Sequence, residues 1–269
     1  MFKVQDSMFS NSNFVIKSAN KLVVKFFLFL FPFSFLLLSC SSKTKITSVV
    51  VSHVNMTDSI SEGDAAIASL ISPYKKELDL TMNEVLNTSE MAMLNDRPEG
   101  ILGNFVADLS LKKAHEIDNA VDFCLLNTGG LRTSLPEGEI TRGKIFELMP
   151  FENELVVITL TGRKTKALFD YLSKVGGQPV AGVKIGIEKD RPEIIYINKV
   201  LFDSTKIYKV VTTDYLANGG DKMDFFKEPI SRKLLNIKLR DAIIEYVVEE
   251  KENGRSINAK FDGRVYYVH

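Results

Sequence analysis

The chain has 269 residues, of which 45% are hydrophobic and 25% are charged. This length and balance are typical of a globular protein that buries a core, as one large domain or two small ones. Its 34 basic and 34 acidic residues give a formal net charge of zero, and the part beyond residue 39 keeps 30 basic and 33 acidic residues, a formal charge of −3. Nucleic-acid binding through bulk positive charge is therefore disfavoured.

Residues 1–39 are expected to form a secretory signal rather than part of the fold. Three lysines precede an apolar run over 26–38 that is too short for an ordinary membrane span. The run ends in Ser39-Cys40 and resembles the lipobox of bacterial lipoproteins, which implies a lipid on Cys40. The alternative is a short uncleaved membrane anchor with an incidental cysteine. Either interpretation exports the chain and tethers it to a bacterial membrane, at the outer membrane or the periplasmic face.

The rest of the chain is expected to comprise a tether and first strand over 40–60 and one domain over 61–269. Lipidation of Cys40 would leave Cys124 as the only thiol, so the mature chain could form no internal disulfide even in an oxidising compartment. Its stability must then come from the hydrophobic core.

Hydrophobic periodicity and capping residues predict the elements of this domain. Helices are expected over 64–80, 102–114, 141–150, 161–173 and 239–247. Strands are expected over 46–54, 121–126, 155–160, 183–187, 193–200, 208–213 and 265–268. Because strands and helices interleave without a regular βαβ alternation, the predicted fold class is α+β, with a mixed β-sheet packed with helices.

The first predicted helix carries apolar residues at helical spacing and an internal proline. The apolar residues are Ile67, Leu70, Ile71, Tyr74 and Leu78. Asp64 lies near the amino end, where the helix dipole favours a negative charge. Pro73 is expected to kink this helix or to split it into a pair of turns.

Two loops that follow predicted strands share one arrangement of residues. They contain Asn127, Gly129, Gly130 and Arg132 in the first, and Tyr215, Asn218, Gly219, Gly220 and Asp221 in the second. Glycine pairs permit positive φ and close approach of a ligand. A guanidinium can hold a phosphate, and a carboxylate can accept bonds from sugar hydroxyls. These loops predict a small-molecule site, although each alone could be an ordinary turn with a surface arginine or a capping aspartate.

Two aromatic residues lie at junctions between predicted elements. Phe151 follows Pro150 directly, and Tyr215 begins the second loop. Two facing rings could sandwich a nucleobase, each stack contributing roughly 1 to 3 kcal/mol. For either ring alone, a place in the core is an equal expectation.

Three motifs together, in their order and spacing, resemble the carboxy-terminal, substrate-binding domain of the 5′-nucleotidase and UDP-sugar hydrolase family. The motifs are Asn-Thr-Gly-Gly-Leu-Arg over 127–132, Pro-Phe-Glu-Asn over 150–153 and Tyr-Leu-Ala-Asn-Gly-Gly-Asp over 215–221. The resemblance extends from about Asp64 to the end of the chain. The family commonly has Phe where Tyr215 stands, a change that keeps the stacking face and adds a hydroxyl.

The resemblance assigns a role to each of these positions. It implies that Asn127 and Arg132 bind substrate and that Asp221 holds the ribose. It implies that Phe151 and Tyr215 clamp the base. A looser match, with a different spacing to Gly103-Asn104, places Arg97 near a further phosphate-contacting arginine of the family.

The resemblance also implies a catalytic domain whose motifs this sequence lacks. In the family, two metal ions held by His, Asp and Asn of an amino-terminal metallophosphoesterase domain hydrolyse the phosphate ester. The histidines here are His53, His115 and His269, which are widely separated and are expected to be solvated or structural. The chain is therefore expected to have no catalytic or metal-binding residue and to serve as the nucleotide-binding subunit of a split exported 5′-nucleotidase. Divalent metals are expected on a separately encoded metallophosphoesterase.

Two alternatives remain open on the sequence. The chain could be a tethered nucleotide- or nucleoside-binding protein without a catalytic partner, or a degenerate scaffold that binds no ligand. The motifs address a generic base, ribose and phosphate, so they do not specify which nucleotide is bound.

Overall fold

The computed structural model describes residues 48–49, 51 and 64–268, and the segment Glu62–His269 forms one compact unit. The signal, the lipid site at Cys40 and most of the strand expected over 46–54 lie outside the described residues. Within the described part, no helix has both the length and the apolar character required to cross a membrane.

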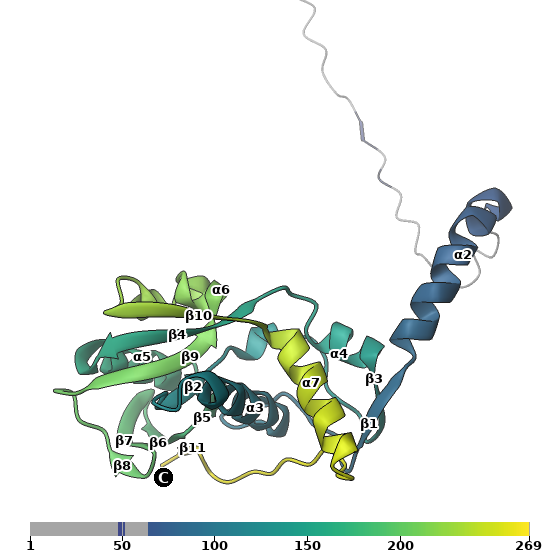
Figure 1. Cartoon of the computed structure of the whole chain (residues 1–269). Coiled ribbons are helices and arrows are strands. Elements are labelled where there is room, and N and C mark those ends of the chain that lie inside the picture. Colours follow the sequence, from purple (N-terminus) through teal and green to yellow (C-terminus); the bar gives the residue numbers. More distant parts are fainter. Residues whose placement is uncertain (1–47, 50, 52–63, 269) are drawn as a thin grey trace, which may run out of the picture. The chain divides into compact units, whose positions relative to one another are not determined.

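A five-stranded mixed sheet forms the centre of this unit (Figure 1). Its strands, in spatial order, are β10 (Ser231–Lys238), β4 (Glu154–Thr161), β9 (Ile207–Thr213), β2 (Phe123–Leu125) and β5 (Val180–Ala181). β2 runs parallel to β9, while the other neighbouring pairs are antiparallel.

Two smaller sheets accompany the central one. The four-stranded sheet contains, in spatial order, β11 (Val265–Tyr267), β6 (Val183–Glu188), β7 (Arg191–Ile197) and β8 (Val200–Leu201). The two-stranded sheet pairs β1 (Val85–Ser89) with β3 (Gly138–Thr141) in antiparallel orientation.

Helices cover both faces of the central sheet, and one further helix, α2 (Ala65–Met82), projects away from it (Figure 1). The other helices are α3 (Ile101–Ile117), α4 (Arg142–Leu148), α5 (Gly162–Lys174), α6 (Asp214–Ala217) and α7 (Leu239–Glu252). Along β4, Leu155 and Val157 belong to a core shared with α3, α4 and α7, whereas Val156 and Ile158 belong to a core shared with α5 and the four-stranded sheet. Burial on both faces explains why the strand is a continuous apolar run.

The α+β prediction with a mixed sheet is confirmed, and so are the helices and the longer strands expected beyond residue 64. Strands β1, β3 and β5 were not predicted, and three further differences concern longer elements. Helix α2 continues through Pro73 without a break. The strand expected over 193–200 is divided by a turn in which Asn198 and Lys199 both have positive φ. Strand β10 was not predicted, because it is an edge strand with mostly exposed polar residues and therefore shows no hydrophobic run.

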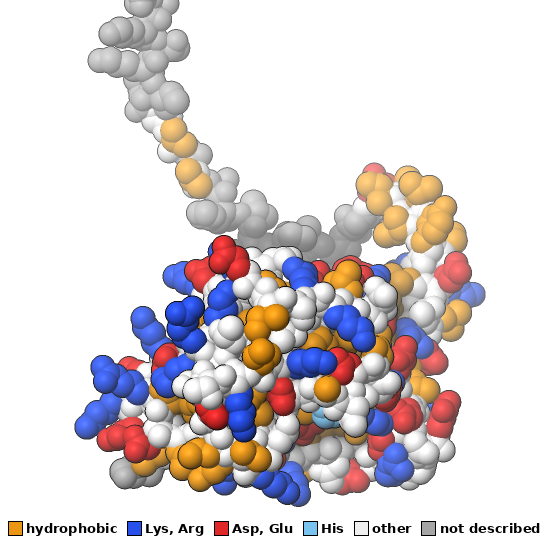
Figure 2. Space-filling view, turned by 60° about the vertical axis from the view of Figure 1, so that its left-hand side comes forward, with side chains coloured by type: hydrophobic (Ala, Val, Ile, Leu, Met, Phe, Trp, Pro, Cys, Tyr) orange, Lys and Arg blue, Asp and Glu red, His pale blue; other side chains and the backbone are white. Residues whose placement is uncertain are grey.

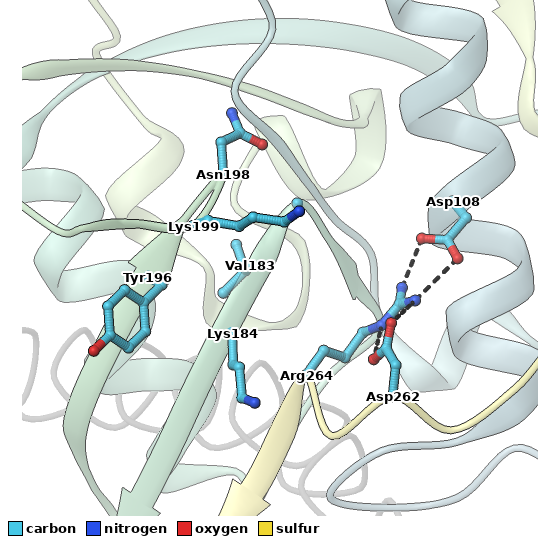
Figure 3. Close-up of a pocket in the computed structure, with 9 residues that line it drawn as sticks. Asp108, Val183, Lys184, Tyr196, Asn198, Lys199, Asp262 and Arg264 are labelled. Carbon is cyan, nitrogen blue, oxygen red and sulfur yellow. Dashed lines mark hydrogen bonds and ion pairs between the residues drawn. The ribbon is translucent and has the colours of Figure 1, made fainter.

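Arg264 attaches the carboxy-terminal segment to the rest of the unit (Figure 3). Its Nη1 and Nη2 atoms donate to the Asp108 carboxylate on α3 at 2.6 and 3.0 Å. Its Nε and Nη2 donate to Asp262 at 2.9 and 2.7 Å, and Nη1 also donates to the carbonyl of Val180 on β5 at 2.9 Å. This one buried guanidinium therefore joins α3, β5 and the strand β11 that follows it.

Replacing Arg264 with methionine should destabilise the fold, because two carboxylates and one carbonyl lose their donor. We expect Arg264→Met to lower the free energy of unfolding by about 2 to 3 kcal/mol, since the arginine side chain is only 11% exposed. The matched control is Lys166→Met, which breaks an exposed pair with Asp170 on α5 and should cost at most about 0.5 kcal/mol. Urea unfolding measures both values, and equal stability of the two variants would contradict the role given to Arg264.

Candidate functional site

Strand direction brings the three motif segments to one edge of the central sheet. Because β2 and β9 are parallel, the loops that follow them leave from the same edge. Strand β4 is antiparallel to β9, with Leu155 opposite Thr213, so the segment that precedes β4 lies at that edge too. The three motifs thus meet at the carboxy-terminal edge of β2 and β9.

The first loop begins with a buried asparagine that reaches across to the second loop. Asn127 is 9% exposed, and its Nδ2 donates to Oδ2 of Asp221 at 2.7 Å. A Cβ atom at Gly130 would lie 2.7 Å from Oδ1 of Asn127. A side chain at this position would therefore push Asn127 away from Asp221.

The second loop folds back on its own tyrosine. Its backbone has φ of 90° at Gly219 and 52° at Asp221, both in the left-handed region. The hydroxyl of Tyr215 donates to Oδ1 of Asp221 at 2.9 Å, and this hydrogen bond raises the pKa of Tyr215. A Cβ atom at Gly220 would lie 2.5 Å from the Tyr215 ring, so only glycine permits this arrangement.

Phe151 and Tyr215 lie at this edge with their rings partly free. Their exposed fractions are 40% and 45%. A hydrogen bond joins the segments that follow Phe151 and precede Tyr215, since the backbone amide of Glu154 donates to the side-chain Oδ1 of Asp214 at 3.1 Å. Exposed rings held at one edge can offer stacking surfaces to a planar ligand.

Glu152, directly after Phe151, is held by two cations. Its carboxylate accepts hydrogen bonds from Nζ of Lys238 and from a guanidinium nitrogen of Arg240. These bonds, first that from Lys238 and then that from Arg240, lower the pKa of Glu152 to about 2. Arg240 is itself buried and lies over the ring of Phe146 at 4.2 Å. The Glu152 clamp, made by Glu152, Lys238 and Arg240, therefore ties the Phe151 segment to α4 and to the start of α7.

The two arginines predicted to bind phosphate each donate to a backbone carbonyl. Arg132 is exposed, and its Nη1 donates to the carbonyl of Gly129 at 3.3 Å. Arg97 donates to the carbonyl of Val175. Both guanidinium groups retain further donors for an anion.

Asn218 has a structural contact in this arrangement. Its Oδ1 accepts a hydrogen bond from Nη1 of Arg232 on β10 at 2.6 Å. The bond attaches the second loop to the edge strand, and a separate ligand contact by Asn218 stays a prediction.

Two residues of this edge were missed in the sequence. The hydroxyl of Tyr171 on α5 donates to the carbonyl of Asp221 at 2.9 Å. Partial burial raises the pKa of Tyr171, and the negative charge of Asp221 raises it further. The positive charge of Arg97 opposes this rise, which places Arg97 within electrostatic range of Tyr171. Gln178 accepts hydrogen bonds from the amide and hydroxyl of Thr128 at 2.7 and 3.0 Å.

The sequence carries one local signal near Tyr171 and Gln178, which is the glycine pair Gly176-Gly177 after α5. A Cβ atom at Gly177 would lie 2.2 Å from the carbonyl oxygen of Pro98, so the chain after α5 passes directly against the segment that holds Arg97. The sequence shows the glycine pair at 176–177 but not which segment it approaches.

His115 has a structural contact, since its Nε2 lies 2.8 Å from the carbonyl oxygen of Val121. His53 and His269 lie outside the described residues. Across residues 64–268, no three His, Cys, Asp or Glu side chains gather into a group that could hold a metal ion.

A separate hollow lies beside Arg264, away from the motif edge (Figure 3). It has a volume of about 560 Å³ and is lined by Val183, Lys184, Tyr196 and Lys199, among others. Its Arg264 side chain, which is 11% exposed, is already bonded to Asp108 and Asp262. We therefore interpret this hollow as a structural feature rather than as part of the candidate site.

Comparison with known proteins gives a family match and partial relatives. The family model described as "5′-nucleotidase, C-terminal domain" matches residues 81–228. The trifunctional nucleotide phosphoesterase protein YfkN of Bacillus subtilis is 31% identical over 216 residues, which cover 72% of this chain and 14% of YfkN. The cell wall protein Lmo0130 of Listeria monocytogenes is 26% identical over 232 residues, which cover 76% of this chain and 29% of that protein.

A solved structure agrees with this match. The 5′-nucleotidase precursor from Thermus thermophilus superposes with a TM-score of 0.66 at 26% identity, over 75% of this chain and 43% of that chain. The chain spans less than half the length of each of these three relatives.

The Glu152 clamp predicts a measurable titration. A carboxyl with a lowered pKa keeps its ion pairs at every pH above its ordinary value of 4.5 and loses them as the pH falls through about 2. Carboxyl NMR should find the pKa of Glu152 near 2 and should find it raised toward 4.5 in Lys238→Met. Lys75→Met, which removes the partner of Asp79 on α2, is the control and should leave Glu152 unchanged. An ordinary Glu152 pKa in the wild type would disprove the clamp.

Proposed function

Since the chain belongs to the 5′-nucleotidase C-terminal domain family, we propose that it is the nucleotide-binding subunit of a 5′-nucleotidase whose dimetal phosphoesterase is a separate chain. The observation that carries the proposal is the bonded set of Asn127, Asp221 and Tyr215 at the edge where Phe151 and Arg132 also lie. This set supplies stacking rings, a carboxylate and a guanidinium within one small region.

Each group has a chemical role in this proposal. Phe151 and Tyr215 stack on the two faces of the base, and their partial exposure leaves ring surface free for stacking. The Asp221 carboxylate already accepts bonds from Asn127 and Tyr215 and retains lone pairs for the ribose hydroxyls.

The phosphate end of the ligand is assigned to the arginines and to the glycine backbone. Arg132 and Arg97 can each hold phosphate oxygens through paired N–H donors. Gly129 and Gly219 lack side chains that would keep a phosphate or a sugar away from the loops. The base and ribose thus fix one end of the nucleotide, and the phosphate is presented outward.

In this proposal the chain binds and orients, and it does not cleave. The divalent ions that would activate water and stabilise the leaving group are assigned to the partner phosphoesterase. The groups of this chain hold the phosphate ester in a fixed orientation toward the metals, which lowers the entropic cost of reaching the transition state.

The cellular location belongs to the same proposal. One of the relatives is a cell wall protein. We infer that this chain is exported and attached to a bacterial membrane through a lipid on Cys40, so that it meets nucleotides outside the cytoplasm.

Nucleotide binding can be tested with the chain alone. By calorimetry with AMP, Phe151→Ala and Tyr215→Ala should each weaken binding by roughly 5-fold to 150-fold, because each removes one stacking surface worth about 1 to 3 kcal/mol. Tyr215→Phe keeps the ring and should cost less than Tyr215→Ala. Phe261→Ala, at an aromatic residue that is 58% exposed and belongs to none of the three motifs, is the control and should bind as the wild type does. A wild-type chain that binds neither AMP nor UDP-glucose would favour the degenerate-scaffold alternative.

Hydrolysis tests the division of labour. Purified chain with Mn²⁺ or Zn²⁺ should leave AMP and UDP-glucose intact, and addition of a metallophosphoesterase from the same organism should produce phosphate. The expected gain depends on Arg132, so Arg132→Ala should reduce it. Strong turnover by this chain alone would contradict the separate catalytic partner, whereas AMP binding without any phosphoesterase response would favour a simple binding protein.

A further inference from the structure

Helix α2 presents an apolar face to solvent. None of its 18 residues is buried. Five large apolar side chains, between 50% and 75% exposed, are Ile67, Leu70, Ile71, Tyr74 and Leu78, and we call them the α2 face. Figure 2 shows hydrophobic side chains gathered on the surface of this projecting helix.

The α2 face has the geometry of a recognition helix. At about 100° per residue, its five side chains fall within a stripe about 100° wide. Their spacing of i, i+3, i+4, i+7 and i+11 is the one by which an amphipathic helix places its anchors in the groove of a partner. Tyr74, 75% exposed near the middle of the stripe, is of a type enriched at the energetic centres of interfaces.

The carboxy-terminal end of α2 lies beside α4 (Figure 1). Nε and Nη2 of Arg142, the first residue of α4, donate to Oε2 of Glu84 at 2.8 and 2.6 Å. A Cβ atom at Gly143 would lie 3.0 Å from the carbonyl oxygen of Met82, so α4 begins directly against the end of α2. Since α4 has seven residues and ends just before Pro150-Phe151, only one short helix separates α2 from the stacking segment.

The position of α2 in the chain indicates what covers it. The family model is that of a carboxy-terminal domain and begins at residue 81, in the last turn of α2. The α2 face therefore lies just ahead of the part of the chain that the model of a carboxy-terminal domain matches, where a preceding domain would join it. The Thermus enzyme has more than half of its chain outside the matched region.

We propose that the α2 face is the docking surface for the separate dimetal phosphoesterase, and this inference rests on the function proposed above. A partner with an apolar groove for α2 would be held on the flank of the domain next to Phe151. The docked chain would then have its metals within reach of a phosphate presented from the motif edge.

A membrane surface fits the α2 face less well than a protein groove does. Helices that lie on membranes carry an excess of lysine and arginine on their polar side. Residues 64–82 contain two lysines and three acidic residues, a formal charge of −1. Lys75 also pairs with Asp79 within the helix, which leaves little positive charge for anionic lipids.

Photocrosslinking in the source organism identifies the occupant directly. The full chain would carry Tyr74→p-benzoylphenylalanine on the α2 face or, as the control, Lys76→p-benzoylphenylalanine on the opposite side of the helix. We expect position 74 to capture a protein with Asp-x-His and Asn-His-Asp or Asn-His-Glu metal motifs, about tenfold more than position 76 does. Capture of a second copy of this chain, of lipid, or of nothing above the control would overturn the proposal.

A pair of charge variants separates docking from nucleotide binding. Leu70→Glu with Tyr74→Glu should reduce AMP hydrolysis by the captured phosphoesterase about tenfold or more, while leaving AMP affinity in calorimetry unchanged. Ser69→Glu with Ser72→Glu adds the same charge outside the stripe and should have no effect on either quantity. Wild-type hydrolysis with the α2 face variant would refute docking and leave the proposed function intact. A wild-type chain that binds no AMP would instead refute the proposed function.

Discussion

The pairing of β9 with β2 on one side and with β4 on the other is the constraint on which the candidate site depends. Parallel β2 and antiparallel β4 bring the segments at 127–132, 150–153 and 215–221 to one edge, although the first and last of these residues are 94 positions apart. Since β4 and β9 are buried on both faces, their register cannot slip without exposing a hydrophobic face. The loops therefore start from fixed positions before any side chain of the site makes a contact.

The polar contacts of the loops act on this fixed edge. Asp221 takes a left-handed backbone conformation, which costs about 1 kcal/mol for a residue with a side chain, and bonds from Asn127, Tyr215 and Tyr171 offset that cost. Gly220 is required because the ring of Tyr215 occupies the space of a Cβ atom. The same network that stabilises the loop thus sets the orientation of the carboxylate and of one aromatic ring.

The two ends of the unit differ in how their apolar and charged groups are used. At the carboxy-terminal end, Arg264 is bonded to Asp108 and Asp262 and closes the structure around β11. At the amino-terminal end, α2 leaves its apolar stripe exposed. Most of the stability of a protein helix comes from the packing of its apolar face against other elements. A partner on α2 would supply that packing on the flank that leads through α4 to Phe151.

The amino-acid sequence by itself determined the α+β class, most of the longer elements and the three motifs, because buried strands, capped helices and glycine loops are local patterns. Only the tertiary structure decided which groups meet. Tyr171 and Gln178 lie on or after α5 in no recognisable motif, and they reach the site because the chain after α5 passes against Pro98. The edge strand β10 could not be predicted either, because most of its residues are exposed and give no hydrophobic pattern. The exposure of the α2 stripe could not be predicted, because hydrophobic periodicity shows which face of a helix is apolar and not whether another part of the same chain packs on it.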